Sequence, residues 1–358
     1  MKKRIGLGFV LMLWSLTSFS QKTTHNNIQQ LMIKPSGKIV CYASGESHPV
    51  YLPPPAFHNK GARTQTTNIQ VTYEGFSANA KAAFQRAVDI WAGLIQSPVK
   101  INIVAQWRSL DPTTLGQANY GTAFANFDGA PKIGVFYPIA LAEKLAGKEL
   151  NPQPTNAGGL YQNYDIYASF NSDIDWAYTD DVNDNATRYN LTTVVLHEIG
   201  HGLGFTDSFD VNSGLGSYGV LGSTPIIFDV GVENGASSNA RVLDQTNNTT
   251  ALGGILVNRN INYNPALSLG GIAGTRAKLF APSSWSPGSS IAHLDQATFT
   301  NTLDMLMRPQ LDKAQITLSP GPSVLNIFAD MGWVSPLITI PGLLIQRIPA
   351  IRLLSMQQ

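Results

Sequence analysis

Two histidines and a glutamate within five residues form the strongest chemical signal in this chain. His197, Glu198 and His201 make the pattern H-E-x-x-H within residues 191–207, LTTVVLHEIGHGLGFTD. Residues four apart share one face of an α-helix, so both imidazoles would point the same way and could hold one metal ion. The pattern therefore predicts a helix with two ligands, and places Glu198 beside the ion without binding it.

Zinc is the metal that this pattern favours. Neutral imidazole is a good zinc ligand, and a catalytic zinc site has three protein ligands and a fourth position open to water. The ion lowers the pKa of that water toward about 7, so a nearby carboxylate such as Glu198 can accept its proton. The expected chemistry is hydrolysis of a peptide bond by water, with Glu198 as general base and no covalent acyl-enzyme.

The third ligand must come from outside the helix. His293 is the only histidine after His201, and it stands in the segment SSIAHLD. Asp207, six residues after His201, is the alternative, because a carboxylate oxygen also binds zinc. Imidazole is the commoner third ligand in such sites, which favours His293; Asp207 would then be a turn residue after Gly204.

Glycines crowd the predicted helix at positions 200, 202 and 204. Each costs about 1 kcal/mol relative to alanine inside a helix, so a structural reason for them is expected. Gly204 suits a helix that ends sharply and turns. The alternative to a metal site is a buried, glycine-rich packing helix with two hydrogen-bonded histidines.

The motifs HEIGHGLGF, SSIAHLD and LMRP together resemble the metzincin zinc peptidases, most closely their leishmanolysin-type branch. The resemblance implies zinc ligands at His197, His201 and His293, the general base at Glu198, and a Met-turn at Met307. Met305 could replace Met307, and a methionine can also be ordinary core filler. The resemblance is strong over residues 192–205, fair over 278–333 and coarse over 69–170.

The same resemblance implies the fold class: an α+β, zincin-like (metzincin) catalytic domain. Its expected parts are a twisted mixed sheet, the active-site helix, a β-rich insertion and a C-terminal subdomain with the Met-turn. Periodicity agrees with this class, since alternating residues predict strands and an apolar stripe predicts a helix that starts at Ser77 or Asn79 and stops before Ser97. The predicted strands are 69–73, 99–107, 133–137 and 164–170, and a short helix is expected at 139–145.

Six segments follow along the chain. Three basic residues before the apolar run 5–16, and small residues near Ser20, predict a secretory signal peptide at 1–20. The other segments are a propeptide or extended N-terminal arm (21–66), an N-terminal zincin subdomain with the metal helix (67–207), an insertion (208–280), a C-terminal subdomain with the third ligand and Met-turn (281–334), and an apolar tail (335–358). The protein is expected to be secreted or on the cell surface.

Composition narrows the partners. A net charge of +1 gives no basis for binding nucleic acid, and no stable membrane insertion is expected. The expected partner is an extracellular protein or peptide substrate; the alternative function is a non-catalytic secreted surface or binding protein that uses the zinc helix structurally.

Cys41 is the only cysteine, so it forms no internal disulfide; it is either a small buried hydrophobe or a thiol that occupies the open metal position of a precursor.

Acidic residues gather before the metal helix. They could bind a structural calcium ion, although their spacing fits no known loop pattern and favours a solvated acidic loop. These residues are Asp165, Asp173, Asp175, Asp180, Asp181 and Asp184.

Overall fold

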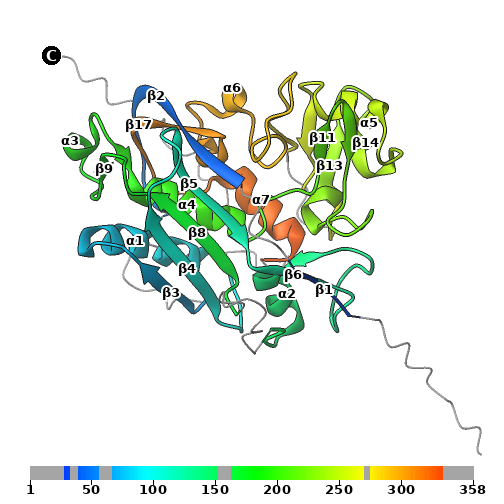
Figure 1. Cartoon of the computed structure of the whole chain (residues 1–358), viewed down its shortest axis with the longest axis horizontal. Coiled ribbons are helices and arrows are strands. Elements are labelled where there is room, and N and C mark those ends of the chain that lie inside the picture. The colour runs from blue at the N-terminus through cyan, green and yellow to red at the C-terminus, as the bar shows by residue number, and fades with distance from the viewer. Residues whose placement is uncertain (1–27, 33–38, 56–66, 152–162, 270–274, 334–358) are drawn as a thin grey trace, which may run out of the picture.

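The computed structural model describes residues 28–32, 39–55, 67–151, 163–269 and 275–333. The signal peptide expected at 1–20 and the apolar tail expected at 335–358 lie outside these ranges. Among the described residues, no helix has both the length and the apolar character needed to cross a membrane. The chain has a mixed α+β fold built on a six-stranded mixed sheet, which confirms the expected α+β class (Figure 1).

Strands from distant parts of the sequence make up the central sheet. Its order is β17 (Gln310–Thr317), β2 (Ile39–Leu52), β5 (Thr114–Tyr120), β8 (Ile166–Asn171), β4 (Ile101–Arg108) and β3 (Ile69–Glu74). The strands β3, β4 and β8 run parallel, and β5 is antiparallel to β8. In turn β2 is antiparallel to β5 and parallel to β17, so the sheet is mixed.

Two helices, α1 (Ala78–Leu94) and α4 (Leu191–Gly202), pack together beside this sheet. The side chain of Ser77 caps α1 by accepting a hydrogen bond from the Ala80 N–H, which settles the predicted start of this helix. Trp91 lies in the buried stripe of α1, and its indole N–H donates to the Leu196 carbonyl oxygen at 2.9 Å. This contact fixes α4 against the core.

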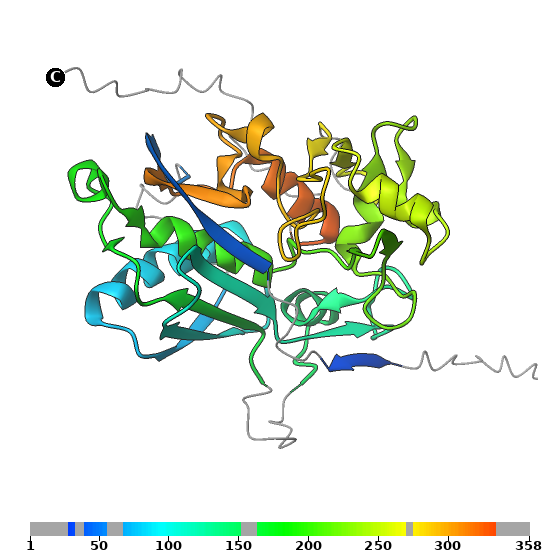
Figure 2. The same ribbon diagram turned by 45° about the horizontal axis from the view of Figure 1, so that its top comes forward.

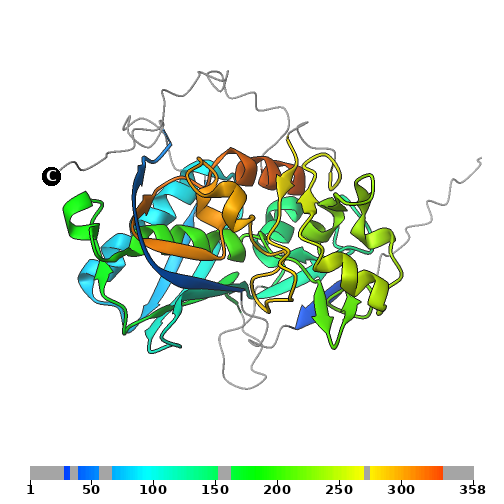
Figure 3. The ribbon, with the colours of Figure 1, turned by 90° about the horizontal axis from the view of Figure 1, so that it is seen from above.

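The segment 21–66 contributes a strand to the interior of the sheet. Its residues Ile39–Leu52 form β2, which lies between β5 and β17 (Figures 2 and 3). The described part of the expected arm therefore contains a strand of the central sheet, as well as β1 (Gln29–Met32), and the sequence analysis predicted neither strand. Gly45 and Pro49 interrupt the alternating pattern, and the pairing depends on partners more than 60 residues away.

Several short strands and helices lie outside the six-stranded sheet. A three-stranded sheet joins β1 (Gln29–Met32), β6 (Thr122–Ala125) and β7 (Tyr137–Pro138), and α2 (Ile139–Ala146) follows it. Of the strand expected at 133–137, only Tyr137 lies in a strand and Phe136 forms an isolated β-bridge with Ile226, because 133–135 lie in a turn and an irregular residue. Before α4 lie β9 (Trp176–Ala177), α3 (Val182–Asn185) and β10 (Tyr189–Asn190).

Residues after α4 form a second group of elements beside the central sheet (Figure 1). Short strands dominate it, and the helix α5 (Thr250–Leu256) packs on β12. The strands are β11 (Asp210–Asn212), β12 (Leu215–Ser217), β13 (Val232–Asn234), β14 (Ala240–Arg241), β15 (Ile261–Tyr263) and β16 (Ala277–Lys278). The 3-10 helices η2 (Ile227–Gly231) and η3 (Val242–Asp244) connect them.

The last described segment returns to the metal helix. It contains α6 (Gln296–Phe299), the single 3-10 turn η4 (Met305–Met307), β17 and α7 (Pro322–Met331). The Trp333 indole N–H donates to the Leu203 carbonyl oxygen at 2.8 Å, at the end of α4. Elements more than 100 residues apart in the sequence thus enclose one helix.

Candidate metal centre

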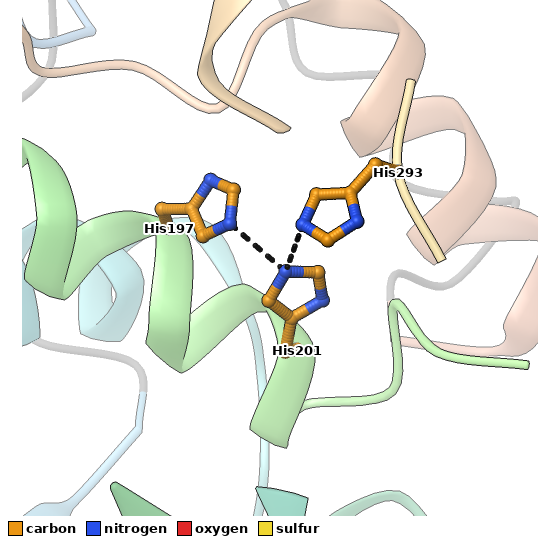
Figure 4. Close-up of side chains that lie close together, drawn as sticks. All are labelled: His197, His201 and His293. Atoms are coloured by element: carbon orange, nitrogen blue, oxygen red, sulfur yellow. Dashed lines mark hydrogen bonds between the residues drawn. The ribbon is translucent and has the colours of Figure 1, made fainter. Parts of the chain in front are cut away.

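Three imidazoles meet at one point between α4 and the C-terminal segment. Figure 4 shows His197 and His201 projecting from α4 toward His293, which lies on a separate segment. The Nε2 atom of His201 is 2.9 Å from Nε2 of His197 and 3.2 Å from Nε2 of His293. The structure therefore brings together the three histidines that the sequence analysis chose as ligands.

Backbone carbonyls orient all three rings. The Nδ1 atoms of His197, His201 and His293 lie 2.8, 2.6 and 2.9 Å from the carbonyl oxygens of Leu306, Phe205 and Ser289, respectively. A carbonyl oxygen only accepts, so each Nδ1 carries the proton and each Nε2 presents a lone pair. The lone pairs of the three Nε2 atoms then face one another, and they repel one another unless a cation lies between them.

The donor set fits a tetrahedral metal ion such as zinc. Nitrogens bound 2.0–2.1 Å from one tetrahedral ion are about 3.3 Å apart, close to the spacings between these Nε2 atoms. Burial lowers the pKa of His197 to about 4 and lowers the pKa of His201 and His293 well below the usual value. The rings are thus neutral at physiological pH, which is the form that binds metal. The group can hold a metal ion.

The carboxyl group of Glu198 lies beside the histidines, and its two oxygens lack a hydrogen-bond partner. The side chain is completely buried, and burial raises the pKa of its carboxyl group well above the usual value. Neither carboxylate oxygen makes a well-formed hydrogen bond, although the Cys41 backbone N–H partly offsets the rise in its pKa. A buried carboxylate without hydrogen bonds lowers the stability of the fold, and it is typical of a group that binds a ligand or a proton.

The close packing of α4 explains its glycines. A Cβ atom on Gly202 would lie 2.3 Å from Cγ2 of Ile166 on β8, and one on Gly200 would lie 3.2 Å from both Sδ and Cε of Met307. Gly204 has a φ of 122°, a conformation that ends the helix and that other residues rarely adopt. The structural reason expected for these three glycines is therefore present.

The turn η4 lies directly beneath the metal helix and contains both candidate methionines. Met305 and Met307 are completely buried, and Met307 is the one that packs against Gly200. The buried Arg308 donates hydrogen bonds to the Met305 carbonyl oxygen, at 2.9 Å, and to the side chain of Gln315 on β17, at 2.8 Å. Sequence reasoning missed this positioning role of Arg308, although the residue lies inside the LMRP motif.

Asp207 does not join the group. Its carboxylate accepts a hydrogen bond from the Phe209 N–H at 2.8 Å, and the three ligand nitrogens that gather come from histidines alone. It has the turn geometry that was the alternative expectation for this residue. As the alternative third ligand, Asp207 is therefore not supported by the geometry.

Strand β2 covers the histidine centre on the side of the central sheet. Cys41 pairs with Gly116 of β5, and its sulfur, a nitrogen of His197 and an oxygen of Glu198 lie within 4.8 Å of one another. A Cβ atom on Gly116 would lie 3.0 Å from Oε1 of Glu198, so only glycine lets the strand pass this closely. Burial and the nearby Glu198 raise the pKa of the Cys41 thiol well above its usual value.

Comparisons with known proteins overlap this centre in part. The sequence model of a family described as SPBPB7E8-like matches residues 108–218. That range runs from the end of β4 through β5, β8 and α4 to β12, so it includes His197, Glu198 and His201 but stops before His293. No curated protein and no solved structure matches the chain.

Proposed function

We propose that this protein is a secreted zinc-dependent endopeptidase. The observation that carries the proposal is the convergence of three Nε2 lone pairs beside a buried carboxylate that lacks a hydrogen-bond partner. A purely structural zinc site does not require Glu198, whereas hydrolysis by water requires a base at this position. A hydrogen bond from Nδ1 to a backbone carbonyl orients each imidazole, as is typical of functional zinc sites.

Zinc held by the three imidazoles would supply Lewis acidity toward a peptide carbonyl and toward the attacking water at neutral pH. The protein's own groups do the rest. Glu198 accepts the proton of the water and then delivers it to the leaving amine nitrogen, so the proton count balances over the reaction. The carbonyl oxygens of Leu306, Phe205 and Ser289 hold the tautomer and orientation of the three imidazoles while this happens, and burial keeps the rings neutral.

The substrate is an extended segment of an extracellular protein or peptide. Added as a strand beside β5, it would form main-chain hydrogen bonds with that strand and bring one carbonyl next to Glu198. In the structure this place is filled by β2, whose residue Cys41 lies nearest to Glu198 and His197. The proposal therefore includes displacement or removal of residues 21–66, the segment expected to be a propeptide or arm, before substrate can enter.

The fold of the proposed enzyme is that of a zincin, and its motifs resemble the leishmanolysin-type metzincins. Support comes from the packing of Met307 beneath Gly200, where that family places its Met-turn, and from the position of His293 far downstream of α4. The expected signal peptide at 1–20 would direct the enzyme to the cell surface or the medium.

A second function is favoured by the burial of the site. His197, Glu198, His201 and His293 are all completely buried in this structure. A secreted binding protein that keeps the ion only to fasten the segment carrying His293 to α4 would have the same arrangement and would never open.

One experiment separates the two functions. Zinc content and hydrolysis of casein are measured for the full chain and for a form that begins at residue 67, each as the natural sequence and as Glu198→Gln. The proposal expects one zinc ion per chain throughout, hydrolysis in the shortened natural sequence, and loss of hydrolysis in Glu198→Gln and after chelation. A shortened chain that holds zinc but cleaves no peptide would support the binding protein.

A further inference from the structure

A second cluster of possible ligands lies away from the metal centre, where α2 meets the beginning of β8. Glu143, Glu149 and Asp165 each offer a carboxylate oxygen, and the three oxygens lie within 4.8 Å of one another. Glu143 is on α2, Glu149 follows the end of that helix, and Asp165 immediately precedes β8. The relative exposure of Glu143 is 1% and that of Asp165 is 0%.

Two oxygens in this cluster lack a hydrogen-bond donor. Oε2 of Glu143 and Oδ1 of Asp165 are buried and have no hydrogen-bond partner. The other oxygen of each side chain is held by a backbone N–H group: Leu150 donates to Oε1 of Glu143 at 2.9 Å, and Asn102 donates to Oδ2 of Asp165 at 2.6 Å. The backbone thus fixes both side chains, and each keeps one buried oxygen without a donor in a group whose carboxylates lie within 4.8 Å of one another.

The charge of this group is only partly compensated by a basic side chain, because Lys100 lowers the pKa of Asp165 less than burial raises it. Within the ranges that the structure describes, no ion pair joins Glu143, Glu149 or Asp165 to a lysine or arginine. Nearby Lys148 pairs instead with Asp128, and Lys144 donates to the Gly332 carbonyl oxygen. Burial, together with the neighbouring carboxylates, raises the pKa of Glu143 to about 10, and burial raises the pKa of Asp165 to about 7. Buried like charges at this spacing need either shared protons or a cation.

We propose that Glu143, Glu149 and Asp165 form a binding site for a calcium ion that fastens α2 to the start of β8. The donors are all carboxylate oxygens, which suit a hard cation, and the absence of imidazole or thiolate disfavours zinc. Calcium accepts six to eight oxygens in flexible geometry, so three carboxylates, some bidentate, with water completing the shell, satisfy it.

The acidic segment before α4 is a different feature and is not part of this site. Its carboxylates already have partners: Asp175 and Asp184 pair with Arg188, and Asp180 pairs with Arg86. Of the six aspartates that the sequence analysis considered together as a calcium loop, only Asp165 belongs to the new cluster, and its companions come from α2 and the turn after it.

The test is calcium binding by the full chain in its zinc-loaded form. Isothermal titration with calcium chloride gives the stoichiometry, and the melting temperature is measured with and without millimolar calcium in zinc-containing buffer. The expected result is one calcium ion per chain and a rise in Tm of roughly 5 °C when calcium is a hundredfold above its Kd. Glu149→Gln and Asp165→Asn should each weaken binding at least about tenfold and remove the Tm rise.

Asp128→Asn is the matched control, because it removes an exposed carboxylate next to Lys148 without touching the cluster. It should bind calcium as the natural sequence does. Glu149→Gln decides the outcome if Asp165→Asn fails to fold, since Glu149 is only partly buried. The proposal is overturned if the natural sequence shows no saturable calcium binding at millimolar concentration, or if Glu149→Gln binds calcium unchanged. A calcium-independent rise in Tm in Glu149→Gln, without calcium binding by the natural sequence, would show that the acids share protons instead.

Discussion

Gly200 of the metal helix lies directly against the thioether of Met307: a Cβ atom added to Gly200 would be 3.2 Å from both Sδ and Cε. The contact joins α4 to η4, the turn whose Leu306 carbonyl oxygen accepts the Nδ1 proton of His197. The side chain of Met307 therefore fixes the distance between η4 and α4. The carbonyl oxygen of Leu306 in η4 orients the ring of His197, a proposed metal ligand.

The first prediction concerns Met307. Because its side chain is completely buried, Met307→Ala should lower the free energy of unfolding by about 2–5 kcal/mol, whereas the volume-conserving Met307→Leu should cost less than about 1.5 kcal/mol and keep full zinc content. Urea denaturation and metal analysis check both. The interpretation would be wrong if the two variants were equally destabilised.

The second prediction decides the third ligand. His293→Ala should weaken zinc binding by more than about a hundredfold, since even the loss of a group that only supports a ligand costs 10–100-fold. Asp207→Ala should retain one zinc ion per chain, because its carboxylate accepts from the Phe209 N–H and is not in the group. Competition with a chelator of known affinity measures both. Loss of zinc in Asp207→Ala with full zinc in His293→Ala would reverse the assignment.

Local patterns allowed one helix beside α4 and three strands of the central sheet to be predicted. Alternation identified β3, β4 and β8, and the apolar stripe identified α1, because each buries one face of a regular element. The strands β2, β5 and β17 were not predicted. Their interior residues include Gly116, Asp312 and Gln315, whose burial is explained only by the close approach of Glu198 and by the hydrogen bonds from Arg308.

The residues of the site also differ in how far the sequence alone predicts them. His197, Glu198 and His201 follow from helical spacing alone, since both rings of a four-residue pair share a face. His293 was favoured as the only histidine after His201 and by the family resemblance, with Asp207 left as the alternative; only the structure places its ring 3.2 Å from His201. The proximity of Cys41 to Glu198 depends on the pairing of β2 with β5, and no window of the sequence contains that information.

The third prediction concerns Gly116. A Cβ atom there would lie 3.0 Å from Oε1 and 3.1 Å from Cγ of Glu198, so Gly116→Ala should displace the proposed general base. If the shortened chain is the peptidase we propose, its kcat should fall by roughly 10²-fold with zinc content unchanged, in line with the usual contribution of a general base. Gly254→Ala is the matched control, because nothing lies within 4 Å of a Cβ atom at that position of α5. Equal activity in both variants would contradict the placement of Glu198.

The fourth prediction tests the closure of the centre by β2. Cys41 is completely buried, so in the native full chain its thiol should react with a thiol reagent on the order of a hundredfold more slowly than in the urea-unfolded chain. The rate is followed spectroscopically, and one thiol per chain is expected because Cys41 is the only cysteine. Rapid labelling of the folded protein would show that β2 does not stay paired with β5.

The fifth prediction is a pH dependence of stability in the metal-free protein. Burial lowers the pKa of His197 to about 4 in the folded chain and also lowers the pKa of His201 and His293, whereas unfolded histidine titrates near 6.5. Below about pH 6.5 the unfolded chain therefore binds protons that the folded chain does not. Each histidine should therefore lower the free energy of unfolding by up to about 1.4 kcal/mol per pH unit as the pH drops toward about 4. Buried carboxyl groups with raised pKa values, such as those of Glu198 and Glu143, contribute with the opposite sign, so the histidine contribution is measured as a difference between two proteins.

Urea denaturation of the metal-free protein at a series of pH values measures this slope. His293→Gln removes one of the three groups and leaves the buried acids unchanged. Between pH 6.5 and 4 its slope should therefore be less positive than that of the natural sequence by up to about 1.4 kcal/mol per pH unit. Above pH 7 both proteins should show no contribution from these residues, because the imidazoles are then neutral in the folded and unfolded states alike. An unchanged slope in His293→Gln would mean that its ring is not held neutral in the folded chain, and the convergence of three lone pairs at Nε2 would lose its support.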